Sequence, residues 1–156
     1  MPLQIGQTAP GFTLFDSDKS KVSLHEQTGN NVLLLFFPFA FSSVCTTELC
    51  SVRDNISRYS SVQAKVFGIS VDSLYTLAKF KTSQNLNFTL LSDFNKEVSH
   101  SYEALYETFS YGMKGVSKRA AFIIDKEGLI QYVEVLDNAG DQPKFESINS
   151  KLEELV

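Results

Sequence analysis

The segment Asn31–Glu48 reads NVLLLFFPFAFSSVCTTE, and it joins a run of apolar residues to a segment with helical periodicity. The run Asn31–Phe37 is continuous rather than alternating, which is typical of a central strand covered by helices on both faces. Pro38 ends this strand, because proline has no amide hydrogen to donate. From Ser42 to about Ser60 apolar residues recur at helix-like intervals, with serine and threonine hydroxyls available to cap the first turn. The segment therefore predicts a buried strand, a short loop and a helix.

The rest of the chain continues this alternation of strands and helices. In chain order we predict a strand at 65–71, a helix at 73–84, a strand at 88–91, a helix at 96–106, a hairpin of 120–124 with 129–135, and a helix at 143–155. The pattern predicts an α/β fold with a central mixed β-sheet flanked by helices. The most loop-like segments, 28–31 and 137–142, are short enough to be surface turns, so residues 1–156 are predicted to form one domain.

Composition and charge exclude several classes of protein. Of the 156 residues, 43% are hydrophobic and 21% charged, which is the balance of a globular chain. The formal net charge is −4 and the basic residues are scattered, so nucleic acid is not an expected partner. No apolar stretch has the length of a membrane span. The first residues, MPLQIGQTAPGF, lack the pattern of a signal peptide, and we expect a cytoplasmic location.

Cys45 is placed in the first turn of the predicted helix, directly after a buried strand. The positive end of a helix stabilises a thiolate, which is the nucleophilic form of cysteine. Pro38 can wall off a pocket without a competing donor, and the Ser42 hydroxyl can donate or accept there. Simpler interpretations remain open: Cys45 as a small buried hydrophobe, Ser42 as an N-cap, and Glu48 as a first-turn carboxylate favoured by the helix dipole.

The spacing of Pro38, Ser42 and Cys45 resembles the active-site motif of the peroxiredoxin family, in which proline, threonine or serine, and cysteine occur at these intervals. The resemblance extends over almost the whole chain, including residues 9–14 (APGFTL) and 90–93 (LLSD). It implies a thioredoxin-like fold and a thiol-dependent peroxidase that uses no cofactor.

The resemblance also implies roles for residues outside the motif. Arg119 matches the family's distant arginine at the start of a strand, although Lys118 lies beside it, and Glu48 would orient that arginine. A fixed cation next to Cys45 would favour its thiolate and hold the peroxide oxygens. Cys50, five residues after Cys45, is similar to the resolving cysteine of the bacterioferritin-comigratory or Q class. The sequence FPFAF around Pro38 is instead similar to the alkyl hydroperoxide reductase E class, which we favour by overall similarity.

The expected partners follow from this chemistry. They are hydrogen peroxide or an organic hydroperoxide as substrate, a thioredoxin-like or other thiol as reductant, and a second copy of the chain in a homodimer through Phe39 and Phe41. One alternative is a one-cysteine peroxidase resolved by an external thiol, with Cys50 an inert buried thiol. A general thiol-disulfide oxidoreductase is less favoured, because no Cys-x-x-Cys motif is present. A chaperone role also remains open.

A copper or zinc module is a further alternative, but its possible ligands are few. The candidate side chains are Cys45, Cys50, His25 and His100. Neither histidine belongs to a motif, and we expect both at the surface. No metal site is therefore predicted.

Overall fold

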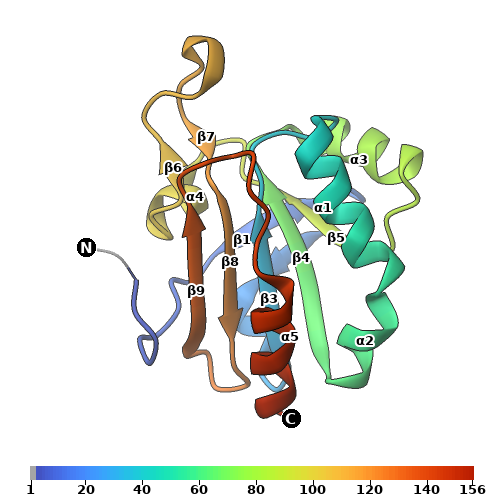
Figure 1. Ribbon diagram of the computed structural model, residues 1–156, viewed down its shortest axis with the longest axis vertical. Helices are drawn as coiled ribbons and strands as arrows, with labels where there is room; N and C mark the ends of the chain where they lie inside the picture. The colour runs from blue at the N-terminus through green and yellow to red at the C-terminus, as the bar shows by residue number, and fades with distance from the viewer. Residues whose placement is uncertain (1–2) are drawn as a thin grey trace.

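The computed structural model describes residues 3–156, and its centre is a seven-stranded mixed sheet with the strand order β2-β1-β5-β4-β3-β8-β9 (Figure 1). The strands of this sheet are β1 (Thr13–Asp16), β2 (Lys21–Ser23), β3 (Asn31–Phe36), β4 (Ala64–Ser70), β5 (Thr89–Ser92), β8 (Arg119–Ile124) and β9 (Ile130–Leu136). The helices are α1 (Ser43–Asp54), α2 (Ile56–Ser61), α3 (Leu74–Ser83), α4 (Glu97–Ser101) and α5 (Phe145–Glu154), with short 3-10 turns at η1 (Leu24–Gln27) and η2 (Ser110–Gly112).

β3 lies at the centre of the sheet, and all its residues are buried. It pairs in parallel with β4 and antiparallel with β8. The predicted mixed sheet, its central strand and the late antiparallel hairpin are therefore confirmed. The parallel pairing places the carboxyl ends of β3 and β4 at the same edge of the sheet, where Phe36 lies opposite Ile69.

Helices cover both faces of the sheet: α1 and α5 lie on one face (Figure 1), and α4 packs on the other. Leu33 and Leu35 pack on one face in a cluster that includes residues of α1, α3 and α5. Leu34 and Phe36 point to the other face and pack in a cluster that includes Tyr102, just after α4. This alternation explains why the apolar run of β3 is continuous in the sequence. No helix among residues 3–156 is both long enough and apolar enough to span a membrane.

The helix predicted from Ser42 to about Ser60 is in fact two helices, α1 and α2, that meet at Asn55. The Asn55 side chain donates to the carbonyl oxygen of Ser51 at 2.8 Å, and its backbone leaves the helical region, with φ −119° and ψ 20°. Asparagine side chains compete in this way with the helical hydrogen-bond pattern. The predicted single helix was therefore too long, although both parts are helical.

The helix predicted at 96–106 was wrong over its second half, because α4 ends at Ser101. The Asp93 carboxylate accepts the amides of Val98 and Ser99 at 3.1 and 2.6 Å, which fixes the start of α4. Glu103 then takes a left-handed backbone conformation with φ 54°, and the chain turns into a strand. The apolar spacing that suggested a longer helix reflects the burial of Tyr102.

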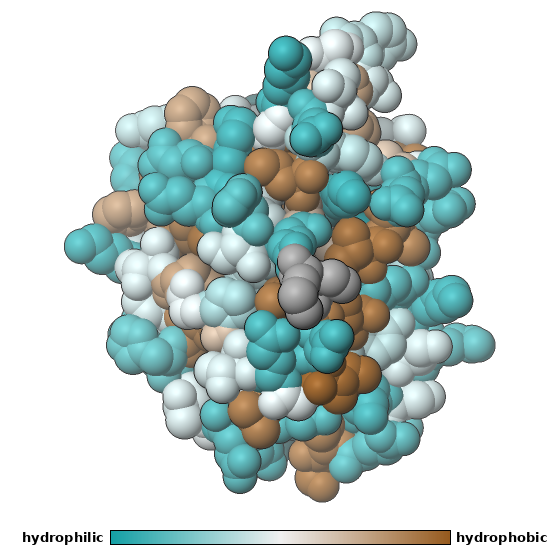
Figure 2. All heavy atoms as spheres, turned by 90° about the vertical axis from the view of Figure 1, so that its left-hand side faces the viewer, coloured by the Kyte–Doolittle hydropathy of each residue, from teal (hydrophilic) through white to brown (hydrophobic). Residues whose placement is uncertain are grey.

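Two small hairpins were not predicted. β1 and β2 form one at the edge of the main sheet. The other is a two-stranded sheet of β6 (Leu105–Tyr106) and β7 (Val116–Ser117). We call residues 105–117 the arm, and Figures 1 and 2 show it projecting from the top of the molecule. Strands this short carry too little alternation to be recognised in a sequence.

Candidate active site

Cys45 is the third residue of α1, and it follows the loop that leaves the carboxyl end of β3. The amides of a first helical turn have no partner within the helix, and with the helix dipole they favour a negative charge nearby. Cys45 is also fully buried, with an exposed fraction of 0%. The fold therefore places a thiol at the positive end of a helix and out of contact with bulk water.

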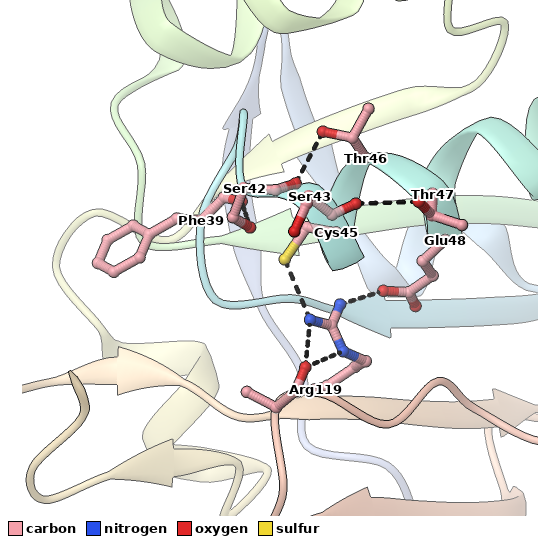
Figure 3. Close-up of polar contacts among 9 residues, drawn as sticks. Phe39, Ser42, Ser43, Cys45, Thr46, Thr47, Glu48 and Arg119 are labelled. Carbon is pink, nitrogen blue, oxygen red and sulfur yellow. Dashed lines mark hydrogen bonds and ion pairs between the residues drawn. The ribbon is translucent and has the colours of Figure 1, made fainter.

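Arg119, the first residue of β8, points at Cys45 from the neighbouring strand (Figure 3). Its Nη2 atom donates to the Cys45 Sγ at 3.3 Å, and its side chain is only 1% exposed. Lys118 instead pairs with Asp137 at 3.3 Å and lies over the Tyr106 ring. The structure thus brings Arg119 to the thiol and directs Lys118 elsewhere, as the alternation of side chains along a strand requires.

Glu48 lies one helical turn after Cys45, and its Oε1 accepts from Arg119 Nη1 at 2.6 Å. Both side chains are buried, at 0% and 1% exposed. Burial raises the pKa of the Glu48 carboxyl to about 7, although the Arg119 guanidinium acts in the opposite direction. Its second oxygen, Oε2, has no hydrogen-bond partner within residues 3–156. Breaking such a buried pair costs about 3–5 kcal/mol, so Glu48 holds the guanidinium firmly in this orientation.

A backbone group completes the support of Arg119. The carbonyl oxygen of Ala139 accepts from Arg119 Nε at 3.3 Å and from Nη2 at 2.9 Å. Ala139 lies in the loop after β9, which the sequence suggested only as a surface turn. A carbonyl contact has no residue-type signature, so nothing in the sequence could have identified it. The guanidinium is therefore fixed by one carboxylate and one carbonyl, and it presents its remaining donors to the thiol.

Ser42 is the residue before α1 and has an extended backbone, with φ −74° and ψ 149°. Ser42 occupies the N-cap position, as one of the two open interpretations had it, but its side chain accepts no amide of the helix. The hydroxyl donates instead to the carbonyl oxygen of Phe39 at 2.8 Å, which leaves its lone pairs free to accept. Figure 3 shows Ser42 beside Cys45 at the start of α1, and Pro38 is buried earlier in the same loop.

Phe41, which lies between Pro38 and Ser42 in this loop, has a positive φ of 70°. A non-glycine residue in the left-handed region costs about 1–2 kcal/mol. Such strain persists only where the surroundings hold the backbone in place, and it is often found beside functional sites. The loop that delivers Ser42 and Cys45 is therefore a strained turn.

Cys50 lies further along α1 and is half-buried. Its Sγ is 3.6 Å from Gln84 Oε1, and both cysteines are free thiols. Five helical residues separate the two Cα atoms by roughly 8–9 Å. A disulfide needs Cα atoms within about 7 Å, so the two thiols cannot join while α1 is intact.

The remaining candidate ligands lie apart from this site. His25 is in η1 and His100 in α4, and both are exposed. Among residues 3–156 no group of three or more histidine, cysteine, aspartate or glutamate side chains is arranged to hold a metal ion.

A helix-borne cysteine held against a buried arginine, on a mixed sheet covered by helices, defines a thiol enzyme of the thioredoxin-like class. Comparison with known proteins narrows this class. The model of the AhpC/TSA family matches residues 5–133. A putative peroxiredoxin of Mycobacterium tuberculosis is 39% identical over 127 residues, which cover 80% of either chain. Peroxiredoxin Bcp of Escherichia coli is 37% identical over 134 residues, 85% of either chain.

Solved structures give the same result. The crystal structure of peroxidoxin BcpB from Mycobacterium tuberculosis superposes with a TM-score of 0.87, at 26% identity, over 99% of either chain. A peroxiredoxin-like protein from Aquifex aeolicus superposes with a TM-score of 0.90, at 25% identity, over 100% of this chain and 90% of its own.

The chain therefore belongs to the AhpC/TSA family, and it is a peroxiredoxin, a thiol-dependent peroxidase with a thioredoxin-like fold. The family and fold that the sequence resemblance implied are confirmed. The Bcp names of these relatives agree with the bacterioferritin-comigratory likeness of the sequence rather than with the E class that we favoured.

Proposed function

We propose that the Cys45 thiolate is the nucleophile that reduces hydroperoxides. The observation that carries this proposal is the 3.3 Å contact between its sulfur and a buried arginine held by Glu48. A cation fixed beside a thiol favours the thiolate, and it needs no reorganisation when charge moves during the reaction. No cofactor is required for this chemistry.

The reaction takes place in one displacement. The thiolate sulfur forms a bond to one peroxide oxygen, the O–O bond breaks, and its electron pair goes to the other oxygen. That oxygen takes up a proton and leaves as water or as an alcohol, while Cys45 is oxidised to a sulfenic acid. We assign to Arg119 and the first-turn amides the role of donors to the two oxygens, to the Ser42 hydroxyl that of an acceptor of the peroxide O–H, since its own hydrogen is donated to Phe39, and to Pro38 that of a wall of the pocket.

Both hydrogen peroxide and small organic hydroperoxides fit this proposal. Phe39 and Phe41 shortly precede Ser42 in the sequence, and apolar side chains near a site tolerate an organic substituent. We further propose that the reductant is a thioredoxin-like or other thiol, and that the protein works in the cytoplasm. Its two free thiols are consistent with a reducing compartment.

Cys50 is proposed as the resolving cysteine. Its thiolate would attack the Cys45 sulfenic acid, release water and form an intramolecular disulfide, which the thiol reductant then reduces. The disulfide requires the first turns of α1 to unwind, because the intact helix keeps the Cα atoms too far apart. Such opening is feasible near a helix end, where few hydrogen bonds are lost.

Peptide mapping after one equivalent of hydrogen peroxide tests this function directly. We expect Cys45 joined to Cys50 within one chain, because an intact neighbouring thiol captures the sulfenic acid. Cys50→Ser is the control, and it should accumulate sulfenic acid at Cys45 that a dimedone-type reagent labels. If the unsubstituted protein shows stable sulfenic acid with Cys50 still alkylatable, it is a one-cysteine peroxidase resolved by an external thiol.

General thiol-disulfide exchange is the second candidate function. Its substrate would be a protein disulfide, which has to reach the attacking sulfur directly. Cys45 is fully buried, and the second thiol is five residues away instead of three. Both features favour a small substrate, so peroxide reduction remains the better assignment.

We also propose a homodimer that uses the surface formed by Phe39 and Phe41. The Phe41 side chain is 52% exposed, although its ring packs on Phe80 with centroids 5.0 Å apart. Sedimentation at micromolar concentration should show a dimer, and Phe41→Glu should shift it towards monomer by placing a charge in the interface. Tyr111→Glu, at a fully exposed residue of the arm, is the matched control and should leave the dimer intact. A monomer in the unsubstituted protein contradicts this proposal.

A further inference from the structure

The loop between β3 and α1 is held by a carboxylate from the neighbouring strand connection. Because β3 and β4 are parallel, the loops that follow them leave the sheet at the same edge. Asp72, two residues after β4, accepts the Ala40 amide with its Oδ2 at 2.8 Å. Ala40 is buried, so this amide depends on a protein partner, and the Asp72 carboxylate supplies one.

Asp72 is itself fixed by the ends of two strands. The Ser70 hydroxyl donates to the same Oδ2 at 2.7 Å, and the Asp72 amide donates to the Ser70 hydroxyl at 3.2 Å. The Ser92 hydroxyl donates to the Asp72 carbonyl oxygen at 2.6 Å. The carboxylate is not used to start α3, because Ser73 is the N-cap there and accepts the Thr76 amide at 3.1 Å. The structural role of the Asp72 carboxylate is therefore to hold the loop between β3 and α1.

The position of Ala40 affects the active site through the backbone of the neighbouring residues. Ala40 lies between Phe39, whose carbonyl accepts the Ser42 hydroxyl, and Phe41, whose φ is 70°. The Ser42 carbonyl in turn accepts the Thr46 amide at 2.9 Å, a hydrogen bond of the first turn of α1. A shift of Ala40 would therefore move the Ser42 hydroxyl and the amides of the turn that carries Cys45.

We propose that Asp72 is a positioning residue of the peroxidase, which acts through the Ala40 amide to hold Ser42 and the first turn of α1 in the reactive geometry. This inference rests on the peroxidase mechanism proposed above. Arg119 approaches the thiol from β8, which lies on the opposite side of β3 from β4, the strand that precedes Asp72. Asp72 therefore governs the alignment of the peroxide more than the formation of the thiolate.

Asp72→Ala tests the proposal through two rates measured on the same protein. The first is the stopped-flow rate constant of Cys45 oxidation by hydrogen peroxide, and the second is Cys45 alkylation by iodoacetamide, followed by peptide mapping. Alkylation needs the thiolate but not the alignment of two oxygens. We expect the peroxide rate to fall on the order of 10- to 100-fold, since small misplacements have effects of this size. Alkylation should change by less than about threefold.

Two further variants separate positioning from general loosening of the structure. Asp72→Asn keeps an oxygen that can accept the Ala40 amide, and it should recover most of the peroxide rate. Ser73→Ala removes the N-cap of α3 at the adjacent residue and leaves the Ala40 contact in place, so its peroxide rate should match that of the unsubstituted protein. If Asp72→Ala does not fold, Asp72→Ser keeps a polar group that is too short to reach Ala40, and the same change in the ratio of rates is expected.

The outcomes distinguish the positioning role of Asp72 from the peroxidase function on which that role depends. An unchanged peroxide rate in the Asp72 variants, or equal losses in peroxide reduction and alkylation, would overturn the positioning role. Loss of rate in Ser73→Ala equal to that in Asp72→Ala would overturn it as well. If the unsubstituted protein does not react with peroxide under the same conditions, the proposed function fails instead.

Discussion

Replacing Cys45 with serine is expected to abolish peroxide consumption while the protein stays folded. A serine hydroxyl remains protonated at neutral pH, whereas the reaction requires an ionised nucleophile. Serine differs from cysteine by one atom, so the buried site keeps its shape. Consumption of hydrogen peroxide and of cumene hydroperoxide, in the presence of a thiol reductant, should fall to the rate without enzyme.

The matched control for Cys45→Ser is Cys50→Ser, which removes the other thiol of the chain. This variant should still consume one equivalent of peroxide in a single turnover, because Cys45 and its surroundings are unchanged. Thermal unfolding followed by circular dichroism should show that both variants are folded. Turnover retained by Cys45→Ser would remove the basis of the proposed mechanism.

Arg119→Ala is expected to lower the rate constant for peroxide by about 10²- to 10³-fold, the size of effect seen when a fixed donor to a developing charge is removed. The stopped-flow rate constant of Cys45 oxidation by hydrogen peroxide measures this loss. Lys118→Ala is the control, and it should stay within about twofold of the unsubstituted protein, since Lys118 pairs with Asp137 instead.

Removing Arg119 also leaves Glu48 without its partner in the interior. The pKa of this carboxyl is already raised to about 7, so without the arginine Glu48 is expected to take up a proton rather than remain charged. The double variant Arg119→Ala with Glu48→Gln removes this complication and should show the same loss of rate. A normal rate in both variants, or a large loss in Lys118→Ala, would show that the wrong cation was assigned.

The sequence predicted the fold best where the spacing of apolar residues directly reflects burial. The apolar run of β3 and the start of α1 directly after Ser42 were predictable because burial on both faces and helical spacing leave clear patterns. Arg119 was reached through resemblance to a family, since a charged residue at a strand edge is by itself uninformative. That it lies 74 positions from Cys45 in sequence and 3.3 Å in space follows from the pairing of β3 with β8.

The features that were missed depend on tertiary context. The end of α4 at Ser101 and the break at Asn55 are set by side-chain contacts with the backbone, which spacing patterns do not register. The Ala139 carbonyl has no sequence signature. Asp72 did have one, because an aspartate just after a strand of a parallel pair lies at the edge where loops carry function. Its partner, the Ala40 amide, appeared only in the structure.

Because Cys45 is completely buried, the size of a molecule limits its access to the Cys45 sulfur. No surface of the Cys45 side chain is exposed, so a molecule reaches its sulfur only when the loop before α1 opens, and we expect the bulky disulfides and electrophiles of a cell to meet the half-buried Cys50 first. The proposed nucleophile and the more accessible thiol are thus two different cysteines of one helix. A reagent's size, more than its intrinsic reactivity, decides which thiol it modifies, and the order of modification reports whether α1 is wound or open.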